Sequence, residues 1–76
     1  MRSEHTYTLE ATDGRWTVRI SQSTSYGYFD KDGEAIGGLW FEGKRLVDQD
    51  GTYSTPKPII PLIRRLGYVV PREFVS

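Results

Sequence analysis

Four pairs of an acidic residue followed by glycine divide most of this chain into short segments. The pairs are Asp13-Gly14, Asp32-Gly33, Glu42-Gly43 and Asp50-Gly51. Three of them are Asp-Gly, the dipeptide best suited to a two-residue hairpin turn, because both central residues of a type I′ turn need a positive φ. Glycine adopts this conformation without a Cβ clash, and aspartate tolerates it better than most residues. The segments between the pairs are rich in aromatic and β-branched residues, so the sequence predicts an antiparallel β-meander.

The first pair predicts a hairpin whose two faces differ in polarity. With Asp13-Gly14 as the turn, Leu9 lies opposite Val18 on one face, and Glu10 lies opposite Thr17 on the other. Because side chains alternate along a strand, the neighbouring residues extend this division into an apolar face and a polar face. We therefore expect one face of the hairpin to pack on a core and the other to contact water.

The segments around the second and third pairs are apolar on both faces. Hairpin turns at Asp32-Gly33 and Glu42-Gly43 place two sets of side chains on opposite faces. One set consists of Phe29, Ile36, Trp40 and Val47. The other set consists of Tyr26, Tyr28, Leu39, Phe41 and Leu46. Within this region Gly37-Gly38 indicates a β-bulge or the close approach of another group, and a bulge would change these face assignments.

The period of the apolar residues changes after the last acidic–glycine pair. The i, i+3, i+4, i+7 spacing of a helix lying on a sheet is followed by Ile59, Leu62, Ile63 and Leu66. A start with Pro58 at the first helical position places Pro61 at the end of the first turn, where the cost of proline is limited. Gly67 is well placed to end the helix, and the residues after it indicate a short strand.

Together these patterns predict one domain of the α+β class, spanning residues 1–76. An antiparallel meander of about five strands should carry one C-terminal helix on one face. The predicted strands span about 5–12, 15–21, 25–30, 35–41 and 45–48. The predicted helix spans about 58–66, and a short sixth strand is expected over 68–70.

Composition and charge exclude several classes of protein. The 76 residues include no cysteine and one histidine, His5, which excludes disulfides and cysteine- or histidine-rich metal sites. Ten basic residues balance ten acidic ones, which argues against a main role in neutralising phosphate or an anionic membrane. The sequence contains neither a secretory signal nor an apolar run long enough to span a membrane. We therefore expect a soluble cytoplasmic protein.

Two stretches read Asp-x-Asp-Gly, namely Asp30-Lys31-Asp32-Gly33 and Asp48-Gln49-Asp50-Gly51. Aligned on the glycine of an EF-hand calcium loop, they place Tyr28 or Leu46 where the first oxygen ligand is needed. We interpret them as turn residues. The sequence also lacks a nucleophile motif, a phosphate-binding glycine loop and a dinucleotide fingerprint. We therefore expect no metal, no cofactor and no catalytic site.

The doubly apolar region provides the candidate binding surface. One helix covers one face of a five-stranded sheet, so the set opposite the helix is expected to bind a protein partner or a second copy. That set is Tyr26, Tyr28, Leu39, Phe41 and Leu46. Strong curling of the sheet, or coverage by segment 68–75, would remove this surface. The alternative function is nucleic-acid binding, with bases stacked on the tyrosines beside Arg15, Arg19 and Lys44; the neutral net charge favours the protein partner.

Overall fold

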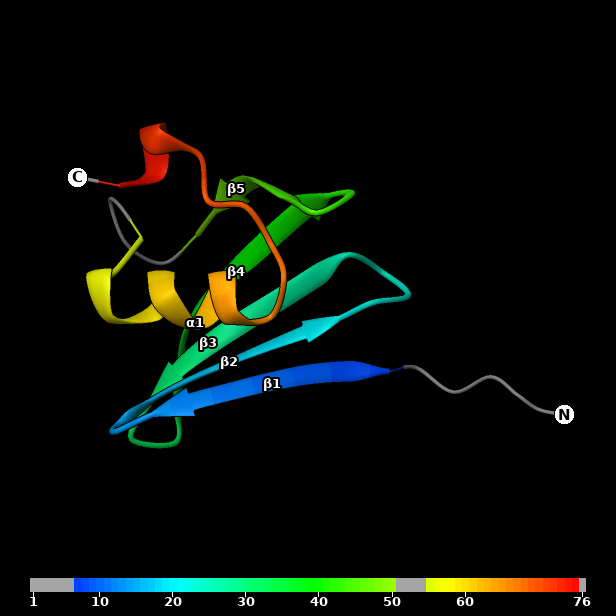
Figure 1. Ribbon diagram of the computed structural model, residues 1–76. Helices are drawn as coiled ribbons and strands as arrows, with labels where there is room; N and C mark the ends of the chain where they lie inside the picture. Colours follow the sequence, from blue (N-terminus) through cyan, green and yellow to red (C-terminus); the bar gives the residue numbers. More distant parts are fainter. Residues whose placement is uncertain (1–6, 51–54, 76) are drawn as a thin grey trace, which may run out of the picture.

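The computed structural model describes residues 7–50 and 55–75. Five strands form one antiparallel sheet in the order β1-β2-β3-β4-β5, with every strand paired to its neighbour in sequence (Figure 1). The strands are β1 (Thr8–Asp13), β2 (Trp16–Ser21), β3 (Tyr26–Lys31), β4 (Glu34–Glu42) and β5 (Arg45–Gln49). The helical elements are η1 (Lys57–Ile59), α1 (Ile60–Arg65) and η2 (Arg72–Phe74). This architecture confirms the predicted α+β meander with a single C-terminal helix.

The helix packs on one face of the sheet, and no other helix or strand of residues 7–50 and 55–75 lies over the opposite face (Figure 1). We call these the covered face and the open face. The core between sheet and helix includes Val18, Ile20, Phe29, Leu39, Phe41, Leu46, Ile59, Leu62 and Ile63. Within β2, and in β3 as far as Phe29, the buried residues alternate with more exposed ones, as expected for strands that contact a core on one side.

The β1–β2 hairpin turns one residue later than predicted. Asp13 pairs with Trp16, so the two turn residues are Gly14 and Arg15. Gly14 has a φ of 62°, whereas Arg15 has no positive φ, which is the pattern of a II′ turn with glycine at its first position. The pairing therefore differs from the predicted one by two residues, with Leu9 opposite Ile20. Because a shift of two preserves the alternation, the predicted faces of this hairpin remain correct.

The β3–β4 hairpin has the predicted turn and then departs from the predicted register. Asp32 and Gly33 have φ values of 56° and 83°, as a type I′ turn requires. Asp30 pairs with Ala35, but Phe29 pairs with Gly37, so Ile36 is the extra residue of a bulge. A shift of one residue moves every later side chain of β4 to the other face.

This bulge overturns the predicted faces of β4 and β5. Leu39, Phe41 and Leu46, predicted on the face away from the helix, are buried beneath it at 0%, 6% and 0% exposure. Trp40, predicted on the helix side, lies on the open face instead. A II′-like turn at Gly43-Lys44 and a second register shift after Trp40 complete the sheet.

The helical segment follows the prediction closely, apart from its first turn. Its first three residues form the 3₁₀ turn η1, and α1 continues to Arg65, so Pro61 lies in the first turn of the α-helix. Gly67 has a φ of 98°. The Gly67 N–H donates to the Arg64 carbonyl at 2.9 Å and the Tyr68 N–H to the Ile63 carbonyl at 3.3 Å, which together form a Schellman motif.

Over residues 68–70, where a short sixth strand was predicted, the structure has a single β-bridge. Val69 pairs in parallel with Arg45 of β5. The Val69 N–H donates to the Lys44 carbonyl at 2.6 Å, and the Leu46 N–H donates to the Val69 carbonyl at 3.0 Å. This segment therefore docks on the β5 edge of the sheet. The predicted turn at Asp50-Gly51 and the start of the predicted first strand, with His5, lie outside the described residues.

Candidate functional site: an aromatic patch on the open face

Three aromatic side chains lie on the open face of the sheet. Tyr26 and Tyr28 come from β3 and Trp40 from β4, and they are 39%, 39% and 38% exposed. We call these three residues the aromatic patch. Val47, which is 43% exposed, lies beside them on β5. Large aromatic side chains exposed on a sheet indicate an interaction surface, because polar residues at the same positions would stabilise the strands equally well.

The patch is arranged by the strand register. Tyr26 lies directly opposite Trp40, and their ring centroids are 5.1 Å apart at an interplanar angle of 62°, an edge-to-face contact that aromatic pairs prefer. Gly38 provides the space beneath the two rings. A Cβ atom there would lie 2.9 Å from the Tyr26 hydroxyl oxygen and 3.2 Å from the Trp40 Cη2 atom. The two rings therefore close over a glycine backbone.

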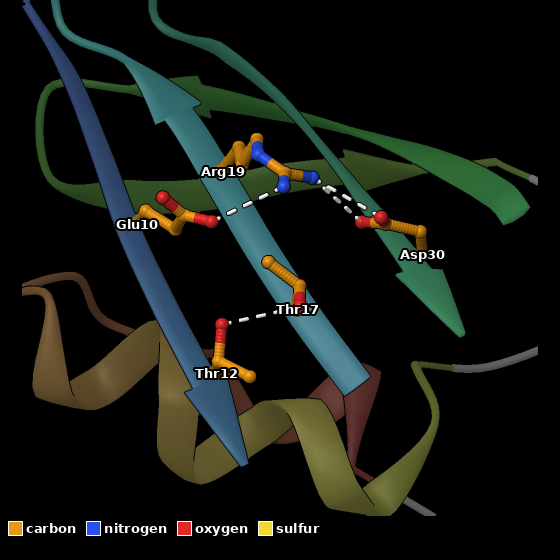
Figure 2. A network of polar contacts seen from close by, with 5 residues as sticks. All are labelled: Glu10, Thr12, Thr17, Arg19 and Asp30. Atoms are coloured by element: carbon orange, nitrogen blue, oxygen red, sulfur yellow. Dashed lines mark hydrogen bonds and ion pairs between the residues drawn. The ribbon is translucent and has the colours of Figure 1, made fainter. Parts of the chain in front are cut away.

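Figure 2 shows a polar network on β1, β2 and β3, and its Arg19 lies beside Tyr28 of the patch. The Arg19 Nη1 atom donates to both carboxylate oxygens of Asp30 at 3.1 Å, and Nη2 lies 3.1 Å from Glu10 Oε2. The same guanidinium lies 5.9 Å from the centroid of the Tyr28 ring. Hydrogen bonding to Asp30 raises the pKa of Arg19. One arginine is therefore held between two carboxylates and a tyrosine ring.

The open face carries more negative than positive charge. By strand alternation and register, its ionised side chains are Glu10, Arg19, Asp30, Glu42, Arg45 and Asp48. Four carboxylates and two guanidiniums give this face a net charge of −2. Asp48 lies opposite Trp40, and in the described part of the chain it forms no ion pair, its Oδ1 accepting only from the Gln49 N–H at 2.8 Å.

The structure separates the five residues predicted for partner binding into two groups. Tyr26 and Tyr28 are on the open face as predicted, whereas Leu39, Phe41 and Leu46 belong to the core. Sequence reasoning missed Trp40 as a surface residue because it did not include the bulge at Ile36. Gly37-Gly38 was expected to indicate a bulge, and the structure has one directly before the pair, but the predicted faces were assigned without it.

Two of the three cations predicted to serve a nucleic-acid surface are engaged at turns. The Arg15 Nε atom donates to Asp32 Oδ1 at 2.8 Å, and the Lys44 Nζ atom lies 4.7 Å from the Tyr68 ring centroid. The hydrogen bond from Arg15 also lowers the pKa of Asp32. Of these three cations, only Arg19 lies beside the patch, and its guanidinium is already bound by carboxylates.

In the first Asp-x-Asp-Gly stretch both carboxylates are bound by arginine. Asp30 binds Arg19 and Asp32 binds Arg15. Over residues 7–50 and 55–75, no group of three or more His, Asp or Glu side chains has the arrangement of a metal site. No helix in the same residues is long and apolar enough to cross a membrane.

Comparison of the chain with protein-family models, with curated proteins and with solved structures finds no match. The functional argument therefore depends on the geometry of the patch and on its charges.

Proposed function

We propose that this protein is a small non-enzymatic module that binds a partner protein through its aromatic patch. The observation that supports this most directly is that Tyr26, Tyr28 and Trp40 are each nearly 40% exposed on a sheet face that the helix does not cover. Tyrosine and tryptophan are enriched in the cores of protein–protein interfaces. The absence of cysteine fits a reducing compartment, and we place the module in the cytoplasm as part of the same proposal.

The size of the patch indicates an anchor within a larger contact. An aromatic side chain has about 150–250 Å² to bury, so three rings at nearly 40% exposure offer about 200–300 Å². A stable interface buries about 800 Å² on each partner. The patch therefore has the dimensions of a hot-spot cluster, in which a few residues contribute most of the binding free energy and their neighbours exclude water.

Nucleic-acid binding through the same rings is the second candidate. Bases stack on aromatic side chains of sheets, and such surfaces also need cations that contact phosphate. Here the adjacent cation, Arg19, is bound by Glu10 and Asp30, and the open face as a whole is negative. These charges favour a protein partner.

The test uses variants that remove a ring without removing core contacts. Wild type, Trp40→Ala and Tyr26→Ala are immobilised and used for affinity capture from a native lysate, with Val75→Ala as the control. Val75 is similarly exposed, at 39%, and lies in the C-terminal segment. We expect proteins retained by wild type and by Val75→Ala to be lost with Trp40→Ala, while the melting temperatures stay close together. Identical retention by all four proteins would contradict the proposal.

A further inference from the structure

The charges of this protein are segregated although its net charge is zero. The open face carries a net charge of −2, as described above. The helical segment on the covered side shows the opposite bias, since residues 57–65 include Lys57, Arg64 and Arg65 and no acidic residue. A chain without this segregation would present no preferred sign of charge at its exposed rings.

The negative charge of the open face lies on both sides of the aromatic patch. On one side, Glu10 and Asp30 share the single cation Arg19, which leaves that network with a net charge of −1. On the other side, Asp48 lies opposite Trp40 and has no ion-pair partner among the described residues. The rings therefore lie between two centres of negative charge.

Resting on the function proposed above, we propose that the partner segment that docks on the aromatic patch is cationic and presents arginine or lysine side chains to it. The face of an aromatic ring attracts a cation, and tryptophan does so best. A guanidinium stacked on Trp40 has a carboxylate within the same cross-strand pair, that of Asp48. Arginine suits such a site because it stacks on rings and binds carboxylates at the same time.

The same charges argue against the two other occupants. A second copy that docked symmetrically through this face would place two negative surfaces against each other, which opposes association. A nucleic acid would bring phosphates toward Asp48 and the Glu10–Arg19–Asp30 network, where Arg19 is already bound by two carboxylates and the face as a whole is negative. A cationic segment, by contrast, would interact favourably with both the rings and the carboxylates.

The direct test is a titration of the full chain by nuclear magnetic resonance with a short arginine peptide, acetyl-Gly-Arg-Gly-Arg-Gly-amide. The matched control peptide carries citrulline in place of arginine and so removes the charge while preserving shape. Trp16 supplies an internal control, because its indole is half-buried on the covered side with the Lys31 Nζ atom 5.3 Å from its ring centroid. We expect the arginine peptide to shift the Trp40 indole signal saturably, to leave the Trp16 signal in place and to bind more weakly as salt rises.

Two charge-neutralising variants sharpen this test. Asp48→Asn should lower the affinity of the protein for the arginine peptide by about two- to fivefold, the range expected for one exposed ion pair. Asp13→Asn removes the same charge from an exposed residue at the end of β1, away from the patch, and should leave the affinity unchanged. Equal binding of the arginine and citrulline peptides would overturn the inference, as would equal effects of the two variants.

The remaining outcomes separate this inference from the proposed function. Trp40-dependent capture of proteins, together with no response to the arginine peptide, would overturn the cationic partner and leave the protein-binding proposal intact. A stronger Trp40 shift with a deoxythymidine decamer than with the peptide would overturn both in favour of nucleic acid. A Trp40 shift that grows with protein concentration alone, with a doubled mass by light scattering, would assign the face to a second copy.

Discussion

The two faces of the sheet differ most clearly at two consecutive residues of β3. Phe29 points into the covered face and is fully buried, whereas Tyr28 points to the open face and remains 39% exposed. Phe29 has no polar atom and packs near Trp16, with ring centroids 6.4 Å apart. Tyr28 carries a hydroxyl group and lies near the guanidinium of Arg19. The difference indicates that the covered face stabilises the fold, while the open face holds rings that keep contact with water.

The largest effect should come from truncating these two neighbours. Phe29→Ala removes a fully buried ring and should lower the free energy of unfolding by about 3–5 kcal/mol. That is a large share of the roughly 4–11 kcal/mol expected for a domain of this size. Tyr28→Ala removes a half-exposed ring and should cost about 1 kcal/mol. Urea denaturation followed by circular dichroism measures both, and similar losses would show that the two faces do not differ in this way.

The glycine pair of β4 offers a comparison of the faces at the level of the backbone. A Cβ atom on Gly37 would collide with the backbone carbonyl of Asp50, whereas one on Gly38 would meet only the side chains of Tyr26 and Trp40. We expect Gly37→Ala to destabilise the fold by about 1–3 kcal/mol, because backbone atoms must move. Gly38→Ala should change stability by less than about 1 kcal/mol, since its rings can rotate and alanine is favoured over glycine in a strand.

Near-ultraviolet circular dichroism gives the second measurement for this pair. Gly38→Ala should alter the aromatic signal of the Tyr26–Trp40 contact while the denaturation midpoint stays close to that of wild type. An unchanged aromatic spectrum, or a loss of stability equal to that of Gly37→Ala, would contradict the placement of Gly38 beneath the two rings.

A third and smaller effect concerns the polar network of the open face. Arg19→Met keeps an unbranched, largely apolar stem but leaves Asp30, which is 8% exposed, without its cation. We expect a loss of about 1 kcal/mol, at the low end for an unpaired polar group because Arg19 itself is partly in water. Arg45→Met is the control, since Arg45 lies on the same face outside the ion pairs of the described residues. Equal stability of both variants would show that the network contributes nothing.

The contrast between hairpins explains how much of the fold could be predicted from the sequence. In the β1–β2 hairpin the predicted pairing was wrong by two residues, yet the faces were correct, because side chains alternate with a period of two. In β4 a single extra residue, Ile36, reversed the predicted faces of Leu39, Trp40 and Phe41. An even error in register is harmless to face assignments, and an odd error reverses them.

Turn chemistry accounts for the other differences. The pairs at Gly14 and Gly43 were expected to place glycine second in the turn, and in the structure glycine comes first, followed by Arg15 or Lys44. Both types of turn need a positive φ at glycine, so composition alone does not distinguish them. The helix was predictable because its apolar period and Gly67 act locally. Two of the three patch residues were predictable, since Tyr26 and Tyr28 precede the bulge in the chain and Trp40 follows it.

The smallest effect is expected at a charge pair that belongs to neither face. Arg15 and Asp32 join the β1–β2 and β3–β4 turns, and the hydrogen bond from Arg15 holds the pKa of Asp32 below its usual 3.8. A carboxylate with a lowered pKa in the folded state contributes stability that is present above its unfolded pKa. That contribution is lost as the pH falls from about 4 through the lower folded pKa. Both side chains are largely in contact with water, so the change in stability should be slight.

Asp32→Asn isolates this contribution, because asparagine also tolerates the positive φ of 56° at this position and Asn-Gly suits a type I′ turn. Melting temperatures measured between pH 7 and pH 2 should fall slightly less steeply for Asp32→Asn than for wild type. Arg15→Gln should reduce the acid dependence by nearly the same amount, since Arg15 is the main cause of the lowered pKa of Asp32 and Lys31 a lesser one. The double variant should show the same acid dependence of the melting temperature as either single variant, because each change removes the same interaction. Additive changes would show that Asp32 owes its lowered pKa to a group other than Arg15.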